Sequence, residues 1–274
     1  QVCLMKGEFP EKTDEIAIDR MYADNNQLVI GDTLTSGTQT WTITGLLALP
    51  DYSCLFEKNS DTMFDATKFG VAVVAQDTFE AISSDDKTFC YAWKYQQSPA
   101  DETEENTRAE DFLKFLSGEV QLEGFIPRYA NQAIVFAGND MGSDRGMMIM
   151  LLYMIIAIMA FVFCLVISDT IAKEAAVIGT LRASGYTKRE LMVHYMTMPV
   201  IVTLVSALLG NILGYSFMKN YCAGMYYGSY SLPTYVTIWN GEAFVLTTVI
   251  PVLMMMVLTW LILRRKLELS PLQF

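Results

Sequence analysis

The sequence lacks most of what a catalytic or metal site needs. Its 274 residues include a single histidine, His194, and neither a GxxxxGK[ST] phosphate loop nor an HExxH motif. One histidine cannot form a zinc site by itself, and no CxxC pair supplies thiolate ligands. We therefore expect no cofactor, no bound metal and no enzymatic activity on this chain, so any ATP hydrolysis belongs to another polypeptide.

Cysteines are few and show no pairing pattern. Of the five, Cys3, Cys54 and Cys90 lie in the first half of the chain, and Cys164 and Cys222 lie in or near apolar segments. An odd number in the first half gives no disulfide framework. We expect free, packed thiols.

Charged residues are missing from three long apolar segments, 147–168, 195–217 and 243–263. A helix that spans a bilayer needs about 20 apolar residues, and each charge at its centre costs roughly 2.5 to 3.5 kcal/mol. The alternative, three buried helices of a soluble core, is disfavoured because charge-free buried helices of this length are rare in a domain of this size. We predict three transmembrane helices.

Basic residues are in short supply before residue 146. Residues 1–145 hold 25 Asp and Glu against 11 Lys and Arg, a net charge of −14, whereas the remainder holds 5 acidic and 8 basic residues, a net charge of +3. An acidic domain repels nucleic acid, so we expect no nucleic-acid partner. The chain divides into a domain at 1–145 and a membrane domain at 146–274.

The connections between the apolar segments differ in basic residues. The connection before the second segment and the tail after the third are basic, whereas the remaining connection holds only Lys219. By the positive-inside rule, the two basic stretches are cytoplasmic and residues 1–145 lie outside. The basic residues are Lys173, Arg182, Lys188 and Arg189 in the connection and Arg264, Arg265 and Lys266 in the tail.

An outside domain must be exported, yet no signal peptide or earlier apolar segment precedes it. The chain begins with Gln1-Val2-Cys3. We therefore expect a fragment of a longer polypeptide that lacks at least one transmembrane helix.

The outside domain has the pattern of an α+β fold. Residues 15–19 predict a strand, and alternating threonines at 40–44 predict a half-buried strand after the turn Ser36-Gly37. Further strands are predicted at 69–74 and 88–94, with a short helix at 76–82. The predicted fold class is thus an α+β extracytoplasmic domain followed by an all-α membrane domain of three transmembrane helices.

Ser98 and Pro99 predict the start of a longer helix that ends near Leu116, with Ser98 as the N-cap. Its acidic residues form a solvated face rather than a cation site, because their spacing matches no calcium loop. Residues 139–145 form either a join to the membrane part or the first turns of the first spanning helix.

The connection at 169–193 is predicted to contain a helix end and a helix start. Gly185 suits a left-handed C-terminal stop, and Thr187 with Glu190 forms a capping box. The new helix then presents Lys188 and Arg189 at the membrane face. Two interpretations stay open, a docking element for a partner and an interfacial helix that anchors to headgroups.

Small and aromatic residues mark the second half. Gly210 and Gly214 form a GxxxG motif that permits close helix packing, either within the chain or with a second copy. Pro199 and Pro251 are expected to kink their helices. The loop after the second span is rich in tyrosine, which we interpret as an aromatic belt at the headgroups.

Residues 174–192, EAAVIGTLRASGYTKRELM, resemble the segment after the second helix of FtsX-like permeases, the MacB-type family of ABC transporters. Segments 7–10, 14–18, 30–33 and 42–45 are similar to the family's extracytoplasmic domain. The resemblance covers nearly the whole chain and corresponds to the family unit without its first helix. The family pattern is close to E-x-x-x-I-G-x-L-R-A-x-G-x-x-x-x-x-[IL], which the chain matches at Glu174, Ile178, Gly179, Leu181, Arg182, Ala183, Gly185 and Leu191.

The resemblance implies a permease subunit in a bacterial cell membrane, working with a separate cytoplasmic ABC ATPase and with a second permease copy or half. The ATPase would dock on the helix after Gly185, and its motion would export or extract an amphiphilic substrate such as a peptide, an antibiotic or a lipid. The implied contact residues are Arg182, Lys188, Arg189 and Glu190. The alternatives are a transmitter that drives an outside partner such as a cell-wall hydrolase, and a ligand-sensing receptor.

Overall fold

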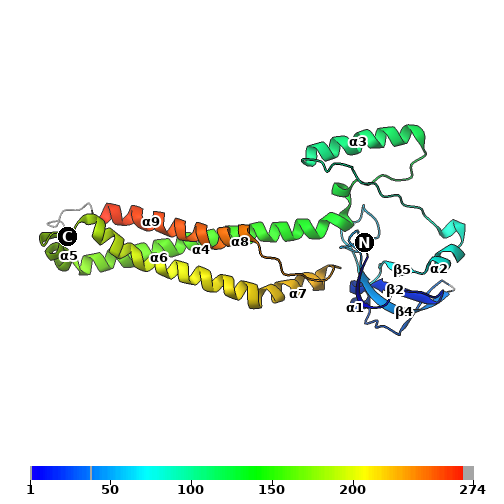
Figure 1. Ribbon diagram of the computed structural model, residues 1–274, viewed down its shortest axis with the longest axis horizontal. Helices are drawn as coiled ribbons and strands as arrows, with labels where there is room; N and C mark the ends of the chain where they lie inside the picture. The colour runs from blue at the N-terminus through cyan, green and yellow to red at the C-terminus, as the bar shows by residue number, and fades with distance from the viewer. Residues whose placement is uncertain (1, 38, 268–274) are drawn as a thin grey trace. The chain divides into compact units, whose positions relative to one another are not determined.

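The computed structural model describes residues 2–37 and 39–267 (Figure 1). The chain forms two compact units. Unit 1 comprises residues 1–140 together with Met225–Tyr235, and unit 2 comprises residues 141–224 and 236–274. The chain therefore passes between the units three times, inside α4, inside α7 and after Tyr235. Met225–Tyr235 is called the returning segment below.

Unit 1 is built on a mixed sheet in the order β1-β4-β2-β5, with β3 paired to β4. β2 and β4 are parallel, and the other pairs are antiparallel. The predicted turn at Ser36-Gly37 lies between β3 and β4, which pair as a hairpin, and Gly37 adopts a φ of +62°. The strands are β1 (Cys3–Gly7), β2 (Glu15–Asp19), β3 (Thr33–Ser36), β4 (Gln39–Ala48) and β5 (Ala72–Val74).

The core of unit 1 lies where β2 and β4 meet α1 (Arg20–Asn25). Ile18 and Ile43 are almost fully buried there, since alternate residues of a strand point to the same face. Burying each such side chain contributes about 1.5 to 3 kcal/mol. The α+β expectation for this part of the chain is confirmed by the mixed sheet.

In the rest of unit 1, two predictions were wrong, the start of one helix and the presence of one strand. α3 spans Glu102–Glu119 and is capped by Asp101, which accepts a hydrogen bond from the Glu104 N–H, so the predicted start at Ser98 was wrong. Residues 88–94 form no strand. The other elements are α2 (Gln76–Ala81), close to its predicted range, and the short 3₁₀ turns η1 (Ser84–Asp86) and η2 (Arg128–Ala130).

Within residues 2–37 and 39–267, three helices are long and apolar enough to cross a membrane, as predicted, namely Gln132–Lys173, Lys188–Ser229 and Gly241–Arg265. The first is α4 (Gln132–Lys173), so residues 139–145 are part of a continuous helix. Apolar side chains such as Phe161 and Ile212 are more than 60% exposed, as expected of surfaces that face lipid. The elements that follow α4 are α5 (Ala175–Ala183), α6 (Lys188–Leu213), η3 (Gly214–Met218), α7 (Lys219–Ser229), α8 (Gly241–Phe244), η4 (Val245–Val249) and α9 (Ile250–Leu267).

A polar contact joins α6 to the π-helical turn η4. The Asn211 side-chain amide donates to the Thr248 hydroxyl at 2.8 Å and to the Ala207 carbonyl at 2.8 Å. Pro251 follows η4 and has no N–H to offer the preceding turn, so the backbone is locally irregular there. Such polar contacts between apolar helices fix their register.

Candidate functional site

The connection between α4 and α6 is a compact structure rather than an open loop. α4 ends at Lys173, and α5 begins after Glu174. The α5 face that carries Ile178 packs into an apolar cluster with side chains of α4, α6 and α9. This cluster, which fixes α5 in unit 2, consists of Ile167, Ile171, Ile178, Leu191 and Leu263.

The end of α5 is closed by two hydrogen bonds of a Schellman motif. The N–H of Tyr186 donates to the Leu181 carbonyl at 3.0 Å, and the N–H of Gly185 donates to the Arg182 carbonyl at 3.2 Å. This geometry requires a left-handed residue, and Gly185 has a φ of +107°. The predicted glycine stop is confirmed.

α6 begins with the predicted capping box. The Glu190 N–H donates to the Thr187 hydroxyl oxygen at 3.3 Å, and the Glu190 carboxylate accepts from the Thr187 N–H at 2.8 Å. The same carboxylate accepts from the Thr187 hydroxyl at 2.9 Å. Glu190 therefore has a structural role in the turn.

Acidic side chains around the connection are already engaged within the chain. Asp169 pairs with Lys173 at 2.6 Å, and Glu174 accepts a hydrogen bond from the Tyr195 hydroxyl at 2.6 Å. With Glu190 in the capping box, all three carboxylates of the connection, at Asp169, Glu174 and Glu190, are engaged by residues other than Arg182, Lys188 and Arg189. Those basic side chains are free to meet an anionic partner.

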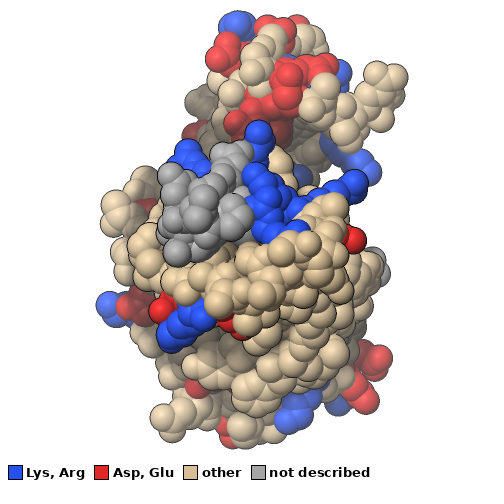
Figure 2. All heavy atoms as spheres, turned by 90° about the vertical axis from the view of Figure 1, so that its left-hand side faces the viewer, with Lys and Arg blue, Asp and Glu red and all other residues tan. Residues whose placement is uncertain are grey.

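The predicted contact residues Arg182, Lys188 and Arg189 lie on this connection. Lys188 and Arg189 are exposed on the first turn of α6, and Arg182 is half-buried near the end of α5. None of the three forms an ion pair within residues 2–37 and 39–267. Figure 2 is viewed from the side on which α5 lies in Figure 1, and it shows several Lys and Arg side chains close together on the face of the helices.

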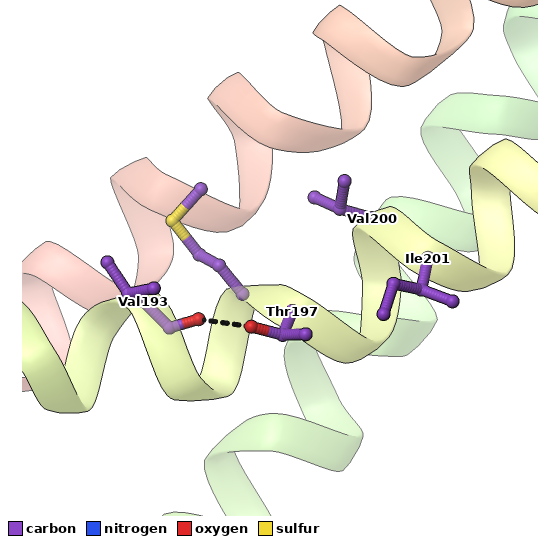
Figure 3. A pocket seen from close by; sticks show the side chains of 5 residues that line it. Val193, Thr197, Val200 and Ile201 are labelled. Carbon is purple, nitrogen blue, oxygen red and sulfur yellow. Dashed lines mark hydrogen bonds between the residues drawn. The ribbon is translucent and has the colours of Figure 1, made fainter.

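A shallow hollow of about 260 Å³ lies on α6 beyond this turn. Figure 3 shows the side chains of Val193, Val200 and Ile201 around it, with the Thr197 hydroxyl turned to the Val193 carbonyl at 2.8 Å. Its lining carries no charge, and its hydroxyl is satisfied within the helix. The hollow suits an apolar neighbour such as an acyl chain and offers no catalytic chemistry.

The GxxxG motif faces open space. A Cβ atom built on Gly210 or Gly214 would meet no atom of another part of the described chain within 4 Å. Of the two interpretations of this motif, packing inside the chain is therefore not observed. Sequence reasoning passed over Asn211, which lies inside the same motif and makes the polar contact to η4.

The connection and the apolar helices lie in a region that matches a known family. Residues 149–271 match the family model described as FtsX-like permease C-terminal, which begins inside α4 and continues through α5, α6 and α9. A search among curated proteins gave no match. The predicted resemblance to FtsX-like permeases is thus confirmed over this region. Residues 149–271 are therefore similar to the C-terminal domain of FtsX-like permeases, and this region includes most of the three helices that are long and apolar enough to cross a membrane.

Proposed function

We propose that this chain couples a cytoplasmic ATPase to the export or extraction of an amphiphilic substrate, and that the ATPase docks on the connection between α5 and α6. FtsX-like permeases generally work with such an ATPase. On this proposal, residues 1–145 are extracytoplasmic and the connection is cytoplasmic, in a bacterial cell membrane.

One observation carries this proposal. The Schellman motif and the capping box hold Lys188 and Arg189 on a rigid turn, while the neighbouring carboxylates are engaged elsewhere. A flexible loop would lose conformational entropy when a partner bound it, whereas this turn is already ordered. Its basic side chains favour a partner with an acidic groove.

A charge reversal tests the docking. Lys188→Glu combined with Arg189→Glu should abolish co-purification with a co-expressed ATPase of the same system, because two attractive contacts become repulsive. The matched control is Lys6→Glu with Lys58→Glu, which makes the same change in net charge at two exposed lysines of unit 1. Binding that survives the first variant, or that is lost equally in the control, would contradict the proposal.

We also propose that Gly210, near the end of α6, and Gly214, the first residue of η3, meet a second permease copy or half. Close approach of two helices requires residues without bulky side chains, and Gly210 and Gly214 leave this surface open. Gly210→Leu with Gly214→Leu should reduce self-association in detergent, measured by cross-linking, while the chain still folds. Ile212→Phe adds bulk on the opposite face of the same helix and should leave association unchanged, so equal effects would rule out the glycine contact.

A further inference from the structure

The returning segment connects two spanning helices in sequence, yet it belongs to unit 1. It includes the last residues of α7 and the chain up to Tyr235. Peptide bonds join it to unit 2 at both ends, after residue 224 and before residue 236. Whatever holds this segment in unit 1 therefore also holds the chain that leads from α6 to α9.

Arg20 holds the segment by capping the end of α7. Its guanidinium donates to the carbonyls of Tyr227 and Tyr230, both at 2.9 Å. The last carbonyls of a helix have no partner within the helix, and a cation next to them is favoured by the helix dipole. The same guanidinium donates to Asp24 at 2.7 Å and lies 5.4 Å from the centre of the Tyr227 ring. A single side chain of unit 1 thus terminates a helix that begins in unit 2.

Asp19 holds the next residues. One carboxylate oxygen accepts from the N–H groups of Met21 and Tyr22, which caps α1, and the other accepts from the Ser231 hydroxyl at 2.5 Å. Asp19 and Ser231 are fully buried. Burial raises the pKa of Asp19, and the three hydrogen bonds act in the opposite direction. The Ser231 N–H adds a bond to the Ser53 carbonyl at 2.9 Å.

Tyr230 anchors the other side of the segment. It is 6% exposed, and its ring centre lies 6.2 Å from that of Phe64 and 6.4 Å from that of Phe136. Its hydroxyl donates to Asp140 at 2.7 Å. Phe136 and Asp140 belong to the first turns of α4. The returning segment and the start of α4 are therefore fixed to the same core.

We propose that Asp19, Arg20, Tyr230 and Ser231 form a releasable clamp that transmits movement of the second and third spanning helices to the sheet of unit 1. The clamp would act beside α4, the other continuous link between the units. Arg20 follows directly on β2, so force on the segment reaches the central strands through one residue. The movement itself would come from the ATPase, so this part of the proposal rests on the proposed function.

Release of the clamp is possible because Arg20 is not fully satisfied in it. Its Nε atom is buried without a hydrogen-bond partner in the described part of the chain. When the segment leaves, water reaches this atom, which offsets part of the loss of the two carbonyl bonds. A contact that opens in this way would supply the two states that a switching element requires.

Hydrogen exchange on the full chain in nanodiscs tests the clamp itself. Arg20→Ala should speed exchange in residues 229–232 by about 10- to 100-fold, because charge-assisted bonds to two carbonyls are lost. The amides of β2 that pair with β4 and β5 should stay protected, which shows that the domain is folded. Ser231→Ala should give a smaller effect of the same kind. Arg108→Ala is the control, because its guanidinium bonds Gln97 and Glu104 instead.

Transmission is tested in the complex with the ATPase, trapped with Mg-ATP and vanadate. In the wild-type chain, trapping should change exchange both at the α5–α6 connection and at residues 15–25, and Arg20→Ala should abolish only the second change. A second change that persists in Arg20→Ala, or fast exchange of residues 229–232 already in the wild type, would overturn the clamp. If the α5–α6 connection does not respond in the wild type, the proposed function and transmission by the clamp both fail.

Discussion

The two connections of the membrane helices are ordered in opposite ways. The α5–α6 connection is held by hydrogen bonds between residues three to five apart, as in the pair Thr187 and Glu190. The returning segment is held by residues 90 or more positions away, 90 in the pair Tyr230 and Asp140 and 212 in the pair Ser231 and Asp19. The first structure needs only its own sequence to form its turn. The second exists only after unit 1 has folded.

Because of this difference, the α5–α6 connection is suited to keep its shape, whereas the returning segment is suited to move. A turn that is satisfied locally keeps its shape when its surroundings move, which suits a surface that another protein must recognise. A contact between distant segments can open as a unit without unfolding either one, which suits a moving part. We therefore expect variants of the two connections to differ in how much stability they lose and in how many residues the loss affects.

The largest effect is expected at Asp19. Asp19→Ala should lower the stability of unit 1 by about 2 to 4 kcal/mol, because the α1 cap is lost and the buried Ser231 hydroxyl loses its acceptor. Asp19→Asn keeps the shape and one acceptor oxygen and should cost much less. The measurement is the urea midpoint of unit 1 in the full chain by pulse proteolysis. Equal costs for the two variants would contradict the role of the hydrogen bonds.

A smaller and more local effect is expected at Thr187. Thr187→Ala removes the capping box and should cost about 0.5 to 2 kcal/mol in the first turn of α6. Exchange at residues 187–191 should speed up while residues 225–235 stay unchanged, and Thr187→Ser should restore protection. An effect that spreads to the returning segment would break the comparison between the two connections.

The smallest effect is expected from acid in unit 1. The Lys12 ammonium, with the backbone N–H groups of Glu11 and Lys12, lowers the pKa of Glu15 from 4.5 to about 2. Its ionised form therefore contributes stability above pH 4.5 that is lost as the pH falls through about 2. Pepsin pulse proteolysis in urea between pH 5 and pH 2 should show a shallower pH dependence for Glu15→Gln.

The control for that experiment is Glu11→Gln, whose side chain makes none of these bonds. It should keep the wild-type pH dependence. If the two variants show the same pH dependence of stability, the lowered pKa of Glu15 does not contribute to the stability of unit 1 in acid.

Features that depend on local chemistry were predicted well. The glycine stop at Gly185, the capping box at Thr187 and the hairpin at Gly37 all follow from backbone geometry within a few residues. The predicted start of α3 was wrong although the rule was local, because Asp101, three residues after Ser98, also fits the capping pattern and is the residue that accepts from the Glu104 N–H. Residues 88–94 have the composition of a strand but pair with none, and Trp93 stacks on Phe125 instead.

The tyrosines of the returning segment show where sequence reasoning ended. Interpreted as an aromatic belt, they gave no reason to connect Tyr230 with Asp140 or Phe136. Nothing in the spacing of these residues distinguishes a ring at a lipid headgroup from a ring buried in a protein core. That distinction depends on which distant side chains the fold brings near.

The sequence by itself determined the three apolar helices, the acidic sheet domain and the turn that presents Lys188 and Arg189, because hydrophobic length, charge balance and capping act over short stretches of chain. Only the tertiary structure decided that the loop between the second and third spans belongs to unit 1. That result depends on the contacts of Asp19 and Arg20 with the end of α7 and the residues after it. The physical reason is that such a contact stabilises the structure only after two remote segments have come together and water has been excluded from between them.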